Sequence, residues 1–204
     1  NHDSRPNRAA IKATPGVIPL HNTSYDVGEG DDRVRIAGFD DPLITTTEDV
    51  PRAEREQVEL DATPRLNALI EREHPDVLAI HNPVILQKVV GMVPLALGGH
   101  QHQAKLGARS GTLISLAGST GATGLGSLLV DADLPASASL LRFRGGVLVS
   151  IDDLEAVGTS GDLTIRRHTI TAADREADNA DFIGRDADEG RLPAADETTI
   201  TTSG

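Results

Sequence analysis

Residues 76–102, DVLAIHNPVILQKVVGMVPLALGGHQH, decide the fold. The stretch opens with a short, almost wholly apolar run over residues 77–80, which is typical of a strand buried on both faces. A helical pattern follows over residues 84–90, and a second buried strand is predicted over residues 94–97. A strand, a helix and a strand in this order predict a crossover between parallel strands. The sequence therefore indicates an α/β fold.

Three histidines follow the two predicted strands. His81 comes directly after the first strand, and His100 and His102 follow the second across Gly98-Gly99. In open α/β sheets, ligands bind beyond the carboxyl ends of the strands. We therefore expect the three imidazoles to converge at one edge of the sheet.

The pair His100 and His102 has a physical meaning of its own. In an extended chain, residues i and i+2 point to the same side. Two imidazoles placed in this way can hold one metal ion, or one each of two adjacent ions. Glycines at positions 98 and 99 leave room for ions and substrate because they have no side chains.

The part of the chain before this stretch is predicted to contain two helices and two strands. The clearest helix is expected to begin with Thr63 as its cap and Pro64 in its first turn, and to end at His74. The other predicted elements are a short helix over residues 4–14 and strands over residues 17–27 and 34–39.

The part that follows is predicted to be a series of strands. Gly145-Gly146 marks a hairpin turn between two of them. After Thr171 the periodicity ends and acidic residues dominate, so we divide the chain into a domain over residues 1–171 and a disordered acidic tail over residues 172–204. The predicted strands cover residues 112–116, 125–130, 139–144, 147–154 and 163–169.

The composition excludes several classes of function. The net charge of -12 and the pI near 4.9 argue against binding nucleic acid or an anionic membrane through a basic surface. Aromatic residues make up only 2% of the chain, which removes the usual stacking platforms for nucleobases. There are no cysteines, so thiolate chemistry and disulfides are excluded, and no apolar run reaches the ~20 residues of a membrane span.

Three short motifs resemble a known family. Asn1-His2-Asp3, the lone His81 and Gly99-His100-Gln101-His102 are similar, in this order, to the last three signature blocks of calcineurin-like metallophosphoesterases. The resemblance runs from Asn1 to about His102 and on through the later strands. It implies part of a four-layer α/β-β/α sandwich, with two sheets face to face, helices outside and the N-terminal part missing.

The resemblance also implies a dinuclear metal centre. Asn1, His81 and His100 would ligate one divalent ion and His102 the other, in the complete protein. Mixed nitrogen and oxygen ligands suit Mn, Fe or Zn.

Two further residues receive roles from the same resemblance. His2 would lie near the substrate, where it would stabilise the phosphoryl oxygens or protonate the leaving alkoxide. Asp3 would accept a hydrogen bond from His2 and so fix its tautomer.

The activity implied is hydrolysis of a phosphomonoester, phosphodiester or pyrophosphate bond by a hydroxide that two metal ions activate. The substrate would be a phosphorylated small molecule or lipid. The family's first two blocks, Asp-x-His and Gly-Asp, precede the Asn-His-Asp block and supply the remaining ligands. The chain beginning at Asn1 lacks them, so we expect it to be inactive alone.

Two other functions remain open. The first is a single-zinc hydrolase in which His81, His100 and His102 form a three-histidine site. The second is a degenerate, non-catalytic interaction domain. Outside these histidines, Asp40-Asp41 is predicted to be a turn of solvated acids that could also line the rim of the site, and His168 is predicted to lie on a solvated strand face.

Overall fold

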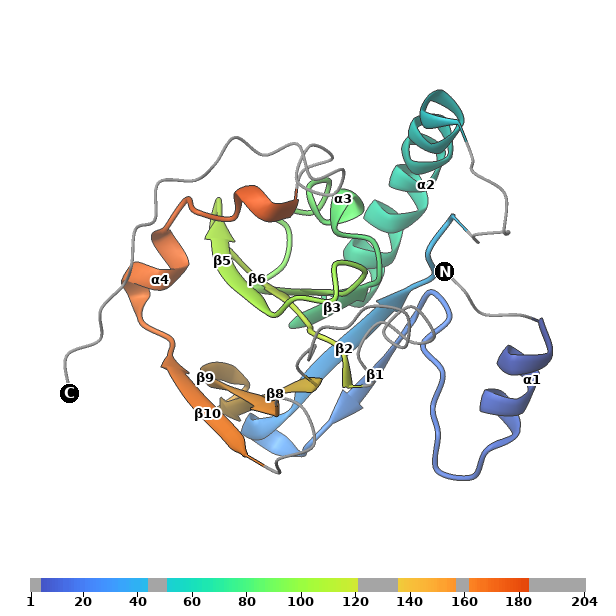
Figure 1. Cartoon of the computed structure of the whole chain (residues 1–204). Helices are drawn as coiled ribbons and strands as arrows, with labels where there is room; N and C mark the ends of the chain where they lie inside the picture. The colour runs from blue at the N-terminus through green and yellow to red at the C-terminus, as the bar shows by residue number, and fades with distance from the viewer. Residues whose placement is uncertain (1–4, 44–50, 121–135, 157–161, 184–204) are drawn as a thin grey trace.

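The computed structural model describes residues 5–43, 51–120, 136–156 and 162–183, and these form two sheets with helices beside them (Figure 1). The larger sheet has six strands in the order β1-β2-β3-β4-β6-β5, and the smaller has three in the order β10-β9-β8. The strands are β1 (Thr23–Val27), β2 (Val34–Phe39), β3 (Val77–Ile80), β4 (Leu95–Gly98), β5 (Lys105–Arg109), β6 (Thr112–Leu116), β8 (Ala136–Arg144), β9 (Val147–Ala156) and β10 (Leu163–Thr169). The helices are α1 (Arg5–Ala13), α2 (Arg52–Glu73), α3 (Pro83–Leu86) and α4 (Ala172–Glu176), with short 3-10 turns η1 (Gly30–Asp32) and η3 (Asp181–Ile183).

The centre of the larger sheet is parallel. Strands β2, β3, β4 and β6 run in one direction, and β1 and β5 are antiparallel edge strands. The predicted crossover is confirmed, because β3 and β4 are parallel neighbours joined through α3. Helix α3 is shorter than the predicted 84–90. It begins at Pro83 and is capped by Asn82, whose side-chain oxygen accepts a hydrogen bond of 2.9 Å from the Val84 amide.

Both faces of the larger sheet are buried, as its apolar runs predict. Leu78 contributes to a core shared with α2 and α3, whereas Val77 contributes to a core shared with the smaller sheet. Leu148 and Ile151 of β9 complete that second core. The prediction of two sheets packed face to face in an α/β fold is therefore confirmed. Among the described residues, α2 and α3 pack on the face of the larger sheet that points away from the smaller sheet.

Helix α2 differs from its prediction. It begins at Arg52 and continues through Pro64, so Thr63 is not its cap; the Thr63 hydroxyl instead donates a hydrogen bond to the Glu59 carbonyl at 3.1 Å. Proline removes one helical amide, which leaves the Leu60 carbonyl without a donor. Leu60 and Pro64 are both exposed, so water can bond that carbonyl. The predicted end is correct, because His74 adopts the left-handed conformation that closes the helix.

Several other boundaries also differ. Strand β1 covers only the end of the predicted 17–27, and the strand predicted over residues 125–130 lies outside the described residues. Strand β5 was not predicted. It forms a hairpin with β6 through Ser110-Gly111, both of which have positive φ. The turn at Gly145-Gly146 is present, again with both residues at positive φ.

The beginning of the predicted acidic tail is folded. Helix α4 starts with a capping box at Thr171, and Ala180 and Ile183 are fully buried in the core beside α3. Asn179 completes the open edge of β5, because its amide and side-chain oxygen bond the carbonyl and amide of Ala108 at 3.0 and 2.9 Å. The folded part therefore includes residues 172–183, and residues 184–204 lie outside the described part.

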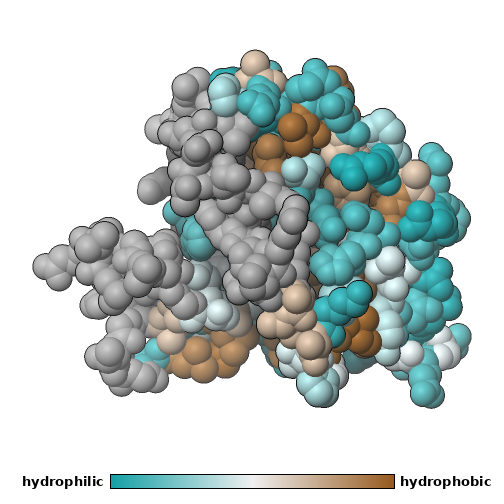
Figure 2. Space-filling view, turned by 90° about the vertical axis from the view of Figure 1, so that its right-hand side faces the viewer, coloured by the Kyte–Doolittle hydropathy of each residue, from teal (hydrophilic) through white to brown (hydrophobic). Residues whose placement is uncertain are grey.

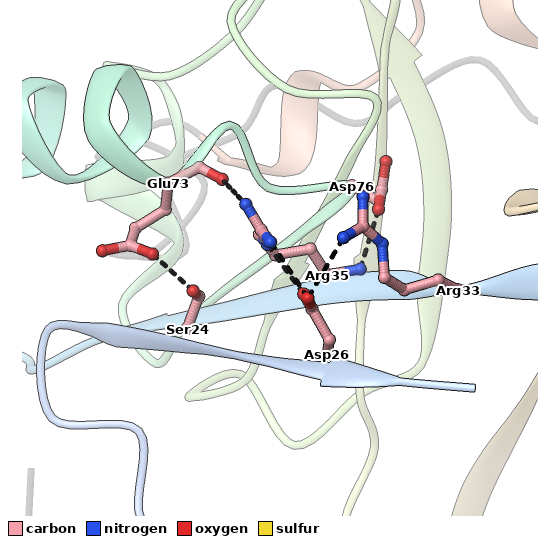
Figure 3. A network of polar contacts seen from close by, with 6 residues as sticks. All are labelled: Ser24, Asp26, Arg33, Arg35, Glu73 and Asp76. Atoms are coloured by element: carbon pink, nitrogen blue, oxygen red, sulfur yellow. Dashed lines mark hydrogen bonds and ion pairs between the residues drawn. The ribbon is translucent and has the colours of Figure 1, made fainter. Parts of the chain in front are cut away.

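A polar network ties the edge strand β1 to the start of the parallel strands (Figure 3). The Arg35 guanidinium donates to both carboxylate oxygens of Asp26 at 2.7 and 2.9 Å and to the Glu73 carbonyl at 3.0 Å. The Arg35 amide donates to Asp76 at 2.7 Å, and the Ser24 hydroxyl donates to the Glu73 carboxylate. The network lies at the edge of the sheet where β2 and β3 begin, so it stabilises the fold away from the histidines.

The surface is mixed in character. On the face that Figure 2 shows, hydrophilic residues predominate among the coloured atoms, and hydrophobic residues form separate patches. None of the described helices is long and apolar enough to span a membrane. Helix α1 lies apart from both sheets in Figure 1.

We predict that Leu78→Ala lowers the free energy of unfolding by about 2–5 kcal/mol, because Leu78 is completely buried in the core below α2 and a cavity would replace its side chain. Leu163→Ala is the matched control. That leucine is 56% exposed on β10, and its loss should change the stability by less than about 0.5 kcal/mol. Urea denaturation followed by circular dichroism measures both, and equal effects would contradict the described packing.

The Asp26–Arg35 contact predicts a pH dependence of stability. The hydrogen bonds from Arg35 lower the pKa of Asp26 below its ordinary value of 3.8, so folding favours the charged carboxylate. This contribution is fully present above pH 3.8 and is lost as the pH falls through the lowered pKa. Asp26→Asn should therefore lower the urea midpoint at pH 7, and the difference from the unmodified protein should shrink towards pH 2. A difference that is the same at both pH values would refute this account.

Candidate functional site

The carboxyl ends of β2, β3 and β4 meet at one edge of the larger sheet. Phe39 is paired with Ile80, and Ala79 is paired with Leu97 in the parallel registers. The residues that follow each strand therefore lie side by side. The Gly99 amide donates a hydrogen bond of 3.0 Å to the His81 carbonyl, which joins the ends of β3 and β4.

His81 and His100 are brought together at this edge. Their ring centroids lie 5.3 Å apart, and the ring planes meet edge to face at 83°. Gly99 makes this possible, because a Cβ atom at that position would lie 3.2 Å from Nδ1 of His81. His81 also lines an open recess of about 410 Å³ beside Phe39 and Leu97.

The turn that carries the other histidines is not extended, so the expectation of an extended chain at His100 and His102 is wrong. Both have left-handed backbone conformations, with φ of 69° and 56°. Gln101 between them is held on three sides. Its amide donates to the Gly99 carbonyl at 2.8 Å, its side-chain nitrogen donates to the Phe182 carbonyl at 2.9 Å, and its side-chain oxygen accepts from Lys105 at 2.9 Å.

His102 has different surroundings from His100. It is exposed and lines a larger cavity between the two sheets, whereas His100 packs against the ring of His81. The expected convergence of three imidazoles is thus described for two of them only. The other predicted site residues, Asn1, His2 and Asp3, lie outside the described residues, so their roles stay predictions.

Asp41 was expected to be a solvated turn residue that could line the rim of the site. It follows β2, the third of the neighbouring strand ends, and its Oδ1 accepts a hydrogen bond of 2.9 Å from the Leu43 amide. Its Oδ2 is buried and has no hydrogen-bond partner among the described residues. Burial raises the pKa of Asp41, and the charge of His100 acts weakly in the opposite direction. The expectation that Asp41 is a solvated turn residue is therefore wrong.

Neighbouring Asp40 has a structural contact instead. Its carboxylate lies 3.0 Å from Nδ1 of His21 and accepts a longer hydrogen bond from Asn22. These contacts fasten the segment before β1 to the end of β2.

The geometry of the histidine pair is compatible with a shared metal ion. A metal–nitrogen distance of ~2.1 Å and a tetrahedral angle place the centroids of two ligating imidazoles ~5 Å apart, close to the observed separation. The buried Oδ2 of Asp41 is a carboxylate oxygen without a described partner, and it lies within electrostatic range of His100. The described residues by themselves contain no group of three or more His, Asp or Glu side chains arranged to hold an ion. A complete site would therefore need ligands from outside the described ranges.

No protein-family model matches the chain, and no curated protein matches its sequence. Among solved structures, the chain is similar to Vps29 from Entamoeba histolytica. A double mutant of Vps29 is 18% identical, with a TM-score of 0.34 over 79% of this chain and 66% of that chain. Wild-type Vps29 complexed with Zn²⁺ is 17% identical, with a TM-score of 0.34 over 72% of this chain and 60% of that chain. The chain spans less than two thirds of these Vps29 chains, and likeness at this level establishes neither a family nor a function.

We predict that Gly99→Ala disturbs the histidine pair, because the added methyl group would crowd Nδ1 of His81 at 3.2 Å. Long-range ¹H–¹⁵N correlation spectra of the imidazoles should show shifted signals for His81 and His100. His74, at the other end of β3, is the internal control and should keep its signals. Unchanged spectra for all three rings would show that residue 99 does not set the position of His81.

Proposed function

We propose that the protein is a metal-dependent phosphoester hydrolase whose centre is built at the carboxyl ends of β3 and β4. The observation that carries this proposal is the packing of His81 on His100 at neighbouring parallel strand ends, with ring centroids 5.3 Å apart. Imidazole is the commonest metal ligand of proteins, and the carboxyl ends of the strands are where open α/β sheets bind their ligands.

The ligand set follows from the resemblance of the motifs. His81 and His100 would bind one ion together with Asn1, and His102 would bind the second. Among the described residues, no three His, Asp or Glu side chains are grouped to hold one ion, which favours this division over a single zinc ion held by all three histidines.

Residues outside the ligand set would support the centre. Gln101, fixed by Lys105 and the Phe182 carbonyl, holds the turn on which His100 and His102 lie. Asp41 places a buried carboxylate beside His100. When bound, two cations ~3.5–4 Å apart would polarise the phosphoryl group and supply hydroxide near neutral pH. His2 and Asp3 keep the roles that the Asn-His-Asp motif implies, near the leaving group.

The substrate we propose is a phosphorylated small molecule or lipid. The chain carries a net charge of -12, and its described arginines form many contacts with carboxylates, such as Arg35 with Asp26 and Arg167 with Asp152. A surface of this kind does not attract a polyanion such as nucleic acid.

The test uses protein expressed from the complete coding sequence, with His81→Ala and His100→Ala as variants and His74→Asn as the control. Asparagine tolerates the left-handed conformation of residue 74, so the control keeps the end of α2 intact. Bound metal is measured after dialysis, and hydrolysis is measured with p-nitrophenyl phosphate and its bis ester. We expect each alanine variant to lose metal and to lower kcat/KM by more than ~100-fold, since a ligand outweighs the 10–100-fold effect of an outer-shell group.

Metal stoichiometry separates the alternatives. Two ions per chain would support the proposal, and one ion per chain would support the single-zinc hydrolase. A protein that retains no metal and hydrolyses neither ester would instead be a non-catalytic interaction domain. Full activity in His100→Ala would overturn the proposed site.

A further inference from the structure

The inner face of the smaller sheet changes from apolar to polar along its length. Leu141, Ile151 and His168 are paired across β8, β9 and β10, and the first two belong to the core between the sheets. Residues two positions further along a strand point to the same face. The next inner row is therefore Ser139, Asp153 and Arg166, and the row after it is Ser137, Glu155 and Thr164.

Polar side chains are unusual on the inner face of two packed sheets, because burial without partners is costly. Here the second row is preorganised. The Ser139 hydroxyl donates to Asp153 at 2.6 Å, and Nε2 of His168 lies 3.3 Å from the other oxygen of Asp153. Arg166 lies 3.7 Å from Glu155, too far for a tight ion pair. These contacts hold Asp153 in position, and the Arg166 guanidinium remains able to donate hydrogen bonds to a ligand.

Five of these residues, Ser137, Asp153, Glu155, Arg166 and His168, line one wall of a cavity of about 970 Å³ between the two sheets. The opposite wall contains His102 and Gln103 from the turn after β4 and Leu106 from β5. The cavity thus extends from the proposed metal edge to the polar rows of the smaller sheet. Its volume lies near the upper end of the range for small-molecule sites, which is ~300–1,000 Å³.

We propose that this cavity binds the alcohol portion of the phosphoester, and that this portion is polyhydroxylated, as in a sugar or polyol phosphate. The inference rests on the proposed hydrolase function. Asp153 and Glu155 accept hydrogen bonds, and Arg166 donates them, which matches hydroxyl groups that do both. Ser137 and Gln103 add neutral groups of the same capacity.

Other ligand classes fit this lining less well. No Phe, Tyr or Trp is among the described residues that line the cavity, so a nucleobase would find no stacking platform. An acyl chain would cover Asp153 and Arg166 without bonding them, at a cost in desolvation. A second anionic group would face Asp153, Glu155 and Asp174.

The first measurement compares substrates on the complete, metal-loaded protein. Steady-state kinetics use glucose 1-phosphate and myo-inositol 1-phosphate, with p-nitrophenyl phosphate as the reference. Asp153→Asn and Arg166→Gln should each raise KM for the polyol esters by ~10-fold or more, because they remove binding groups for the alcohol portion. Their kcat/KM for p-nitrophenyl phosphate should fall much less than their kcat/KM for the polyol esters, because the aryl ester has no hydroxyl groups to bond these side chains.

The matched control is Arg142→Gln. Arg142 lies on the same sheet, pairs with Asp152 on the opposite face and does not line the cavity, so KM for the polyol esters should not change. If Asp153→Asn lowers the Tm, Arg166→Gln decides the outcome, because its side chain is 65% exposed and its removal should not affect folding. An unchanged KM in Arg166→Gln, or an equal rise in Arg142→Gln, would overturn the inference.

A second measurement does not depend on hydrolysis. Saturation-transfer difference NMR with glucose and myo-inositol on metal-free protein should show transfer to the ring protons, and Arg166→Gln should weaken it. Transfer without hydrolysis of any ester would keep the cavity assignment and reject the hydrolase. Hydrolysis of p-nitrophenyl phosphate without transfer, and without preference for polyol esters, would reject the cavity assignment alone.

Discussion

The parallel pairing of β2, β3 and β4 is the constraint on which the rest of the structure depends. Each of these strands is short and contributes apolar side chains to both cores, so its stability depends on packing on both faces. Once Phe39 is opposite Ile80 and Ala79 is opposite Leu97, the residues after each strand must share one edge. Asp41, His81 and His100 are neighbours for this reason, although up to 59 residues of chain separate them.

The sequence predicted those features that depend on local pattern. Strand β3 was predicted with its exact residues. Val77–Ile80 is a short apolar run that follows the helix-ending His74-Pro75 and stops at His81, which is typical of a buried strand. The closeness of His81 and His100 followed from the parallel crossover alone. The left-handed backbone at His100 and His102 could not be predicted, because it depends on how Phe182 and Lys105 hold Gln101. The contact with Phe182 comes from a residue 81 positions away in sequence.

Other features were not predicted because neighbours outweigh local preference. Pro64 normally marks the first turn of a helix, yet α2 runs through it since its exposed side tolerates the lost amide. The acidic composition after residue 171 predicted a tail, but Ala180 and Ile183 supply enough burial to fold its first part. The polar rows of the smaller sheet become visible only when the strand register places Asp153 and Arg166 on the inner face.

The backbone at His100 and His102 also bears on how the protein would change under selection. A left-handed conformation costs a non-glycine residue about 1–2 kcal/mol, so glycine at either position would relieve strain while deleting an imidazole. Variants selected only for a higher Tm should therefore accumulate glycine or asparagine at these two positions. They would lose the imidazoles proposed to bind metal. Retention of both rings in a lineage would mark continued use of the site, independently of any assay.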